Sequence, residues 1–220
     1  MVESRYLKAM AFVHCILLPY KGRKYSVLKS TPVGFLKEFM SKPGTTGAVA
    51  PSSAFLAQMM VAALDLGNAE AVLEYGPGTG VFTEYILREM KPASKFAAIE
   101  VNPQFAEIFK ARFPGARLVE DSVANVRAIC DEAGMPAVDC IVSGLPWASF
   151  SESMQLQFLD EMMKVLKPGG HFVTFAYVHG LALPPAKRFA GLLPNYFTSV
   201  SKSPVVWMNV PPAFVYRCRR

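Results

Sequence analysis

The sequence predicts an α/β fold with a mostly parallel sheet and helices on both of its faces. In residues 71–83 an apolar strand runs into a glycine-rich turn and then a helix. A second apolar strand, 95–100, ends in an acid twenty positions after the last glycine of that turn. Strand-like and helix-like segments then alternate until seven strands are reached. We therefore expect one sheet-based domain, residues 47–220, that binds a nucleotide-like ligand and follows a helical N-terminal extension, residues 1–46.

The glycine-rich turn carries the ligand prediction. Gly76, Gly78 and Gly80 allow positive φ angles, and without Cβ atoms they let a ligand lie against the backbone. The spacing Gly-x-Gly-x-Gly differs from the dinucleotide fingerprint G-x-G-x-x-G. Phosphate-binding sites direct backbone N–H groups toward an anion. Here an acid, Glu74, precedes the turn, and this indicates a ligand that carries a positive charge.

Glu100 ends the second strand, where a nucleotide-binding unit places a carboxylate that accepts the ribose hydroxyls. The run from Glu74 to Gly80, followed by Glu100, resembles the class I S-adenosylmethionine-dependent methyltransferases. The resemblance implies a Rossmann-like seven-stranded sheet, S-adenosyl-L-methionine as cofactor and S-adenosyl-L-homocysteine as product. Val101, next to Glu100, is included in the predicted cofactor site. The alternative is a glycine-rich turn without a ligand.

Composition limits the setting in which the protein works. The four cysteines are scattered without a C-x-x-C pair, so we expect neither a metal site nor a disulfide framework, and a reducing cytoplasm fits. The longest apolar run, 9–18, is shorter than the roughly twenty residues that span a bilayer. Residues 19–24 follow it where a signal peptide would have a small-residue cleavage site, so export is not expected.

The N-terminal extension is basic and apolar. Residues 1–44 hold eight Lys or Arg and two Glu, 8 − 2 = +6, and many bulky apolar side chains. This composition suits an element in an anionic membrane interface. It also suits RNA binding, or helices that pack on the sheet and expose a basic edge.

The extension ends at a break, residues 43–47, and Ser52 or Ser53 can cap a helix over 55–64. Class I methyltransferases often place a segment that closes over the methionine end of the cofactor where this chain has residues 47–53. A turn followed by a cap explains the same residues.

The third strand brings a second acid to the predicted ligand site. Asn102 and Pro103 begin a helix that we expect to reach Arg112, and 116–120 is the next strand. Asp121 and Ser122 follow it, where the resemblance places an acid and a backbone amide beside the adenine ring. A simple helix cap is the alternative for this acid.

The fourth strand, 137–142, leads into a loop that we expect to face the acceptor, because ligands gather at the carboxyl ends of parallel strands. Its first residue, Ser143, is assigned to the cofactor. The next four are assigned to the substrate: Gly144, Leu145, Pro146 and Trp147. Methyltransferases of the adenine amine carry Asn or Asp where this chain has Gly144, which offers no side-chain acceptor.

The remaining elements complete the sheet. We expect a helix over 152–166 that stops at 167–170, and a strand over 171–177. A proline-initiated segment, 184–189, and strands near 197–200 and 213–217 follow.

The extension, the glycine turn and the segments 47–53, 143–146 and 175–177 together resemble the bacterial phospholipid N-methyltransferases. These are related to the rRNA adenine dimethyltransferases. The resemblance implies a monomer on the inner face of the cytoplasmic membrane that converts phosphatidylethanolamine stepwise toward phosphatidylcholine. Ornithine lipid and rRNA adenine are the alternative acceptors, and a non-catalytic membrane-bound sensor is the alternative from another class.

Methyl transfer to an amine needs chiefly positioning and a neutral nitrogen. Tyr177 is the first catalytic candidate, and His179 is the second. Trp147, Phe150 and Tyr177 are expected to surround the methylated cation. Arg188, or its neighbour Lys187, is expected to meet the lipid phosphate.

Overall fold

The computed structural model describes residues 53–62 and 64–220. The predicted membrane-binding extension, 1–46, and most of the segment 47–53 lie outside these residues. The described chain contains a seven-stranded sheet with the order β3-β2-β1-β4-β5-β7-β6. The strands are β1 (Ala71–Tyr75), β2 (Lys95–Ile99), β3 (Arg117–Val119), β4 (Val138–Ser143), β5 (Leu166–Tyr177), β6 (Ser199–Lys202) and β7 (Ala213–Arg219).

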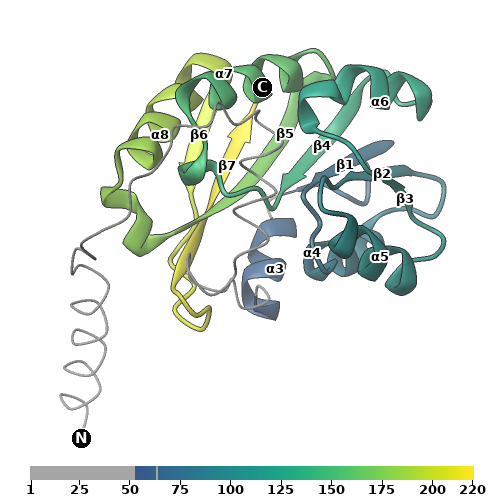
Figure 1. Cartoon of the computed structure of the whole chain (residues 1–220), viewed down its shortest axis with the longest axis horizontal. Helices are drawn as coiled ribbons and strands as arrows, with labels where there is room; N and C mark the ends of the chain where they lie inside the picture. Colours follow the sequence, from purple (N-terminus) through teal and green to yellow (C-terminus); the bar gives the residue numbers. More distant parts are fainter. Residues whose placement is uncertain (1–52, 63) are drawn as a thin grey trace, which may run out of the picture. The chain divides into compact units, whose positions relative to one another are not determined.

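The first five strands are parallel, and β7 is antiparallel to both β5 and β6. The α-helices are α3 (Ala54–Val61), α4 (Val81–Glu89), α5 (Pro103–Arg112), α6 (Val126–Glu132), α7 (Glu152–Met163) and α8 (Pro184–Tyr196). Three 3-10 turns join them: η1 (Val123–Asn125), η2 (Trp147–Ser149) and η3 (Val178–Ala182). Figure 1 shows α6, α7 and α8 over one face of the sheet and α3 and α4 over the other. The predicted Rossmann-like fold is confirmed.

Both faces of β1 are covered, so all five of its residues are buried. A strand in this position does not need the alternation of polar and apolar residues that a half-exposed strand shows. Leu73 and Tyr75 belong to the core cluster that includes α6, α7 and α8. Val72 belongs to the cluster that includes α3 and α4. Because β1 lies between β2 and β4 in the sheet, the glycine turn that follows it lies in the middle of the carboxyl edge of the parallel strands.

Two helix ends differ from the sequence prediction. Ser53 caps α3 as expected, but the helix ends at Val61 rather than at 64. Helix α7 ends at Met163 rather than at 166, because Val165 and Leu166 are buried and join the sheet. The Val165 carbonyl accepts the Val138 N–H at 2.8 Å, and Leu166 pairs with Val138. The predicted stop at 167–170 is therefore an irregularity inside β5.

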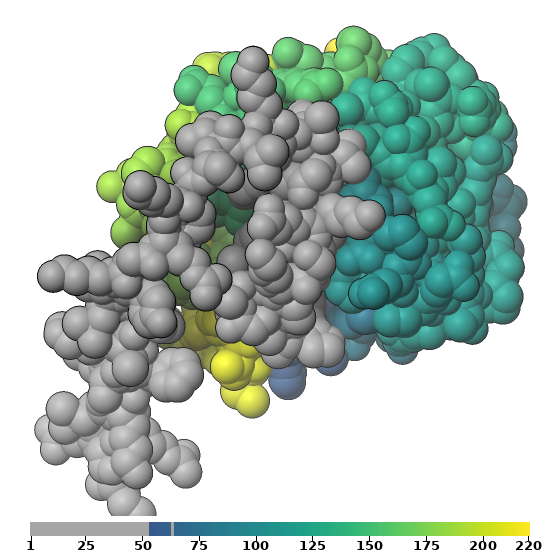
Figure 2. All heavy atoms as spheres, viewed as in Figure 1, coloured from purple at the N-terminus to yellow at the C-terminus, as the bar shows by residue number. Residues whose placement is uncertain are grey.

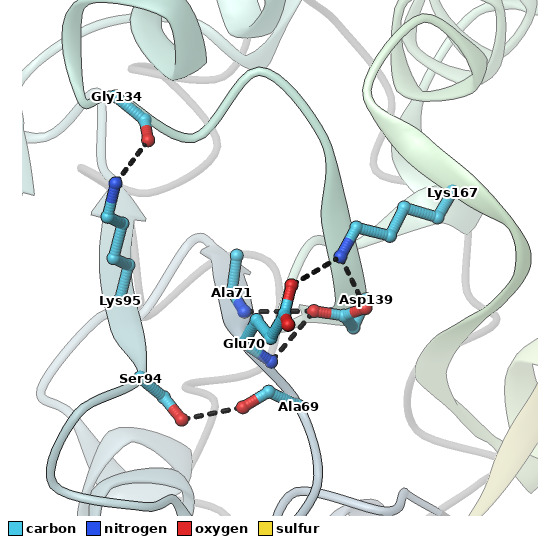
Figure 3. Close-up of polar contacts among 8 residues, drawn as sticks. All are labelled: Ala69, Glu70, Ala71, Ser94, Lys95, Gly134, Asp139 and Lys167. Carbon is cyan, nitrogen blue, oxygen red and sulfur yellow. Dashed lines mark hydrogen bonds and ion pairs between the residues drawn. The ribbon is translucent and has the colours of Figure 1, made fainter.

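A partly exposed ion pair joins strands at the opposite, amino-terminal edge of the sheet (Figure 3). Asp139 Oδ2 accepts the N–H groups of Glu70 and Ala71, both at 2.9 Å. Lys167 Nζ lies 2.8 Å from Asp139 Oδ1 and 3.3 Å from Glu70 Oε2. Burial opposes ionisation of Asp139, but its hydrogen bonds outweigh this effect and lower the pKa. The contacts join β1, β4 and β5 at the end away from the ligand edge.

Among the described residues, no helix has both the length and the apolar character needed to cross a membrane. The same part of the chain contains no cluster of His, Cys, Asp and Glu that could hold a metal ion. Cys130, Cys140 and Cys218 are buried thiols without disulfide partners.

Candidate active site

A cavity of about 570 Å³ opens at the carboxyl edge of the parallel strands. Its lining comes from the glycine turn after β1, the ends of β2 and β3, the loop after β4, and the end of β5 with η3. This is where open α/β sheets bind their ligands, and the volume suits a small molecule.

The three glycines of the turn all have positive φ, as predicted: 64° at Gly76, 56° at Gly78 and 82° at Gly80. A Cβ on Gly80 would lie 2.2 Å from the Phe113 ring, and one on Gly76 would lie 2.8 Å from Leu145 Cδ2. These two glycines are needed for packing within the protein, and Gly80 does not line the cavity. A Cβ on Gly78 would meet no atom of the described residues within 4 Å. Gly78 is therefore the position at which the turn leaves room for a ligand.

Glu100 lies beside Gly78 on the cavity wall and is 2 % exposed. Its Oε2 accepts the Gly78 N–H at 3.1 Å, and its Oε1 accepts the Asn102 N–H at 2.9 Å. Burial raises the pKa of Glu100 although these backbone hydrogen bonds lower it. Each carboxylate oxygen keeps further acceptor capacity, so Glu100 is held in place and can still accept two hydroxyl groups.

Glu74 lies outside the cavity lining and is fully buried. Thr83 Oγ1 donates to its Oε2 at 2.7 Å, whereas Oε1 has no partner among the described residues. Burial raises the pKa of Glu74 to about 8; the Thr83 bond lowers it and the nearby Glu100 raises it further. An acidic group without a full set of partners therefore lies next to the glycine turn, where a positive charge would stabilise its ionised form.

Asp121 and Ser122 line the cavity, and the cap of the following turn is Ser122 rather than the acid. Ser122 Oγ accepts the Ala124 N–H at 3.2 Å as the cap of η1. Asp121 Oδ1 accepts the Ser122 N–H at 2.6 Å and the Asn125 Nδ2 at 2.9 Å. Val101 lines the same part of the cavity.

Ser143 was assigned to the cofactor, but its side chain is buried and does not line the cavity. Its Oγ accepts the Leu145 N–H at 3.3 Å and the Trp147 Nε1–H at 3.0 Å. Ser143 therefore shapes the loop that follows β4. The four residues after it do line the cavity, as predicted.

Gly144 has a packing reason that sequence reasoning missed. A Cβ there would lie 2.5 Å from the Gly76 carbonyl oxygen, and the Gly144 N–H donates to the Tyr75 carbonyl at 2.8 Å. The loops after β1 and β4 touch backbone to backbone at this point. Any side chain at 144 would push the two loops apart. A Gly144→Asn substitution would therefore disturb the contact between the loops whether or not it also changed the choice of acceptor.

The aromatic residues of this loop pack mainly into the core. Trp147 stacks on Phe189, with ring centroids 4.5 Å apart and an interplanar angle of 18°. Phe150 is fully buried against Phe158 and does not line the cavity. The prediction that Phe150 helps to surround a cation is therefore wrong. Trp147 still contributes to the wall of the cavity.

Two predicted residues at the far rim differ in their placement. Tyr177 lines the cavity, its ring stacks on His179 at 5.5 Å, and burial raises the pKa of its hydroxyl. Arg188 does not line the cavity. Its Nε donates to Gln155 Oε1 at 3.4 Å, and its guanidinium lies 3.8 Å from Glu152. The predicted contact between Arg188 and the substrate is not supported, because this side chain is engaged with α7.

A family model described as a methyltransferase domain matches residues 72–170. The matched stretch contains the glycine turn and Glu100, and it is similar to methyltransferase domains. Over 188 residues the chain is 29 % identical to the ornithine lipid N-methyltransferase of Singulisphaera acidiphila. The matched region covers 84 % of this chain and 94 % of that protein. The chain is 34 % identical over 120 residues to the probable ribosomal RNA small subunit methyltransferase A of Methanosarcina barkeri, covering 53 % of this chain and only 38 % of that protein.

Solved structures share the fold of this methyltransferase domain at low identity. TrmN from Thermus thermophilus has a TM-score of 0.59 and 18 % identity, covering 84 % of this chain and 53 % of that one. The O-methyltransferase TomG from Streptomyces achromogenes has a TM-score of 0.59 and 16 % identity, covering 87 % of this chain and 92 % of that one.

The cofactor of a class I methyltransferase domain is S-adenosylmethionine, and the residues present here fit it. Gly78 leaves space on the cavity side, and Glu100 offers acceptors for two hydroxyl groups. Glu74 does not line the cavity, but its buried Oε1 has no partner among the described residues, and a nearby positive charge would stabilise its ionised form. When bound, the cofactor supplies an electrophilic methyl group on a positively charged sulfur.

Sequence reasoning missed two buried polar residues of the methyltransferase domain. Thr83 is the hydrogen-bond donor that holds Glu74. Gln155 donates from Nε2 to the Trp147 carbonyl at 2.7 Å and to the Pro185 carbonyl at 3.1 Å, and so joins the loop after β4 to α8. The available signal for Gln155 was its position beside Met154 and three residues before Phe158, on the apolar side of the predicted helix 152–166; the other amide of that helix, Gln157, is exposed.

The raised pKa of Glu74 predicts a pH-dependent stability of the ligand-free protein. In the unfolded chain Glu74 loses its proton near the reference value of 4.5, whereas in the folded protein it keeps the proton until about 8. Between these values the folded state binds more protons, so its free energy of unfolding falls as pH rises, by at most about 1.4 kcal/mol per pH unit. Glu74→Gln should remove this contribution.

Urea unfolding of both proteins between about pH 5 and about pH 8 measures the effect. We expect the wild type to lose stability relative to Glu74→Gln as the pH rises. Parallel pH profiles for the two proteins would show that Glu74 is already ionised in the folded state.

Proposed function

We propose that this chain transfers methyl groups from S-adenosylmethionine to the amine headgroup of a membrane lipid. The observation that carries the proposal is a difference between two halves of the cavity. The half formed at the ends of β1, β2 and β3 carries both carboxylates of the described lining, Glu100 and Asp121. The half formed by the loop after β4, β5, η3 and α8 carries none and is lined mainly by the apolar side chains Leu145, Pro146, Phe175, Leu181, Leu183 and Phe189. An apolar half suits an acceptor attached to acyl chains.

The relative from Singulisphaera acidiphila supports this proposal because the similarity extends over nearly the whole of that protein. The matches to the ribosomal RNA methyltransferases span well under half of those proteins. An adenine amine also needs a hydrogen-bond acceptor in the loop after β4, and Gly144 has no side chain to provide one. We therefore do not propose a nucleic acid substrate.

The side chains on the two halves have different proposed roles. Glu100 holds the ribose hydroxyls, and Asp121 with the Ser122 backbone holds the adenine ring. The loop 144–147 excludes water from the nitrogen under attack. That nitrogen must be neutral when it forms its bond to the methyl carbon, and the proton that it loses passes to solvent. Tyr177 keeps its own proton because burial raises its pKa, so we assign it the positioning of the amine rather than proton removal.

Phosphatidylethanolamine is the acceptor that the sequence resemblance implies, and ornithine lipid is the second candidate because of the relative that acts on it. Both lipids carry a primary amine a few atoms from an anionic group, phosphate in one and carboxylate in the other. We also propose that residues 1–46 bind the inner face of the cytoplasmic membrane as a unit separate from the domain 47–220, and that the enzyme acts as a monomer.

Methyl transfer to three acceptors in parallel tests the proposal. The purified protein is given methyl-labelled S-adenosylmethionine with vesicles of phosphatidylethanolamine, vesicles of ornithine lipid, or rRNA. We expect label in the lipid fraction of at least one vesicle sample and none in rRNA. Label in rRNA alone would contradict the proposal, and transfer to ornithine lipid alone would identify the second candidate as the substrate.

A further inference from the structure

The loop between β6 and β7, residues 203–212, buries a polar side chain and exposes apolar ones. Trp207, Met208 and Val210 are 69 %, 70 % and 76 % exposed, whereas Asn209 between them is 3 % exposed. Loops in water normally have the opposite arrangement. These three side chains are the most exposed large hydrophobic residues in the described part of the chain. Such a group marks an interaction surface.

Hydrogen bonds at Asn209 hold the apolar side chains outward. Asn209 Oδ1 accepts the Ser53 N–H at 2.9 Å, and Nδ2 donates to the Pro211 carbonyl at 2.7 Å. The Asn209 N–H donates to the Val206 carbonyl at 3.2 Å. Because the polar residue is used to fix the loop, the exposure of its neighbours is built into the fold. In Figure 2 yellow atoms of the last part of the chain and blue atoms from the start of α3 project beside one another at the lower edge.

The loop lies at the rim of the cavity. Ala213, which follows it, pairs with Tyr177, and the Val178 N–H donates to the Pro212 carbonyl at 2.9 Å. Pro211 lines the cavity, as does the half-exposed Leu183. A surface that contacted Trp207 and Met208 would therefore face the cavity mouth.

The charge of this part of the chain indicates what that surface is. Residues 162–220 contain no Asp or Glu, so no acid close in sequence to the loop would repel an anionic surface. Of the cations in this stretch, Lys167 and Arg220 bond near the opposite edge of the sheet and Arg188 bonds to α7. Lys202 is exposed at the end of β6, directly before the loop. Exposed Trp, Met and Val beside a cation match the interface of an anionic bilayer, where an indole ring lies at headgroup depth and a lysine meets the lipid charge.

We propose that the loop 203–212 inserts Trp207, Met208 and Val210 into the membrane interface and so places the cavity mouth against the lipid headgroups. The proposal deepens the proposed function and rests on it for the identity of the acceptor. It differs from the prediction for residues 1–46 in the segment that inserts. The loop belongs to the domain that holds the cavity, and salt does not screen the insertion of its apolar side chains.

The fluorescence of Trp207 tests the insertion directly in the full-length chain. The chain has two tryptophans, and Trp147 lines the cavity, so the part of a lipid-dependent emission change that is lost in Trp207→Phe reports Trp207. With anionic vesicles we expect the emission to shift to the blue and brominated acyl chains to quench it. The double variant Met208→Ser/Val210→Ser should reduce vesicle partitioning at high salt by roughly tenfold or more. The matched control is Ile108→Ser, a partly exposed apolar residue on α5, which should leave partitioning unchanged.

Emission that stays unchanged when vesicles are added would overturn the proposal. So would a blue shift that depends on protein concentration without lipid, which would show that a second copy of the chain covers the loop. Methylation of a short-chain, water-soluble aminolipid separates the two proposals. The double variant should retain this activity while losing turnover on vesicles. If the wild type methylates neither form of lipid, the proposed function fails, whereas the fluorescence still decides whether the loop inserts.

Discussion

Replacing Gly78 by alanine is expected to abolish the binding of S-adenosylhomocysteine while the protein stays folded. The added methyl group would meet no atom within 4 Å in the described part of the chain, so it projects into the space proposed for the cofactor. Overlap with the ligand should lower the affinity by roughly 100-fold or more, about 3 kcal/mol. The positive φ of 56° adds backbone strain of about 1 kcal/mol, which lowers stability rather than affinity.

Gly134→Ala is the matched control for that strain. Gly134 also has a positive φ, 63°, and lies outside the cavity lining, where a new Cβ would meet only Lys95 Nζ at 3.5 Å. Both variants should lose a similar amount of stability in thermal unfolding. In calorimetric titration only Gly78→Ala should lose affinity for S-adenosylhomocysteine. Equal affinities for the two variants would place the cofactor elsewhere.

Glu100→Ala should have a comparable effect on the cofactor by a different route. The substitution removes both carboxylate acceptors proposed for the ribose hydroxyls. Hydrogen bonds to a charged group contribute about 1.5–3 kcal/mol each, so the loss of two should weaken S-adenosylhomocysteine by roughly 100-fold or more. The Gly78 and Asn102 N–H groups also lose their acceptor, so the turn becomes less well ordered.

The Asp139→Ala variant is the control that separates the loss of acceptors for the ribose hydroxyls from the loss of acceptors for backbone N–H groups. Asp139 also accepts two backbone N–H groups, but it does so at the opposite edge of the sheet. The variant should be destabilised and should still bind S-adenosylhomocysteine with unchanged affinity. If Glu100→Ala behaved in the same way, Glu100 would have only a structural role.

The parts of the fold that were predictable from sequence depend on local chemistry. The five parallel strands, the cap at Asn102 and the three positive-φ glycines follow from patterns within a few residues, and all are present. The end of α7 was not predictable, because Val165 leaves the helix to bond with Val138 of another strand. A partner that lies far away in sequence gives no local signal.

The same distinction applies to the site. Which strand ends meet follows from the parallel topology, so Glu100, Asp121 and the loop after β4 were correctly brought to one cavity. Which way a side chain points depends on packing partners elsewhere in the chain. Phe150 packs into the core against Phe158, and Arg188 forms an ion pair with Glu152 on α7. Gly144 is small because Gly76 lies against it, and no motif within the loop reports that contact.

We propose that this chain methylates the amine of a membrane lipid. The most direct measurement is mass spectrometry of lipids extracted from a bacterium that makes phosphatidylethanolamine but no methylated lipids and that expresses either the wild type or Glu100→Ala. We predict phosphatidylethanolamine species carrying one or more added methyl groups only with the wild type. Unmodified phosphatidylethanolamine, together with newly methylated adenine in the rRNA of the same cells, would contradict the account.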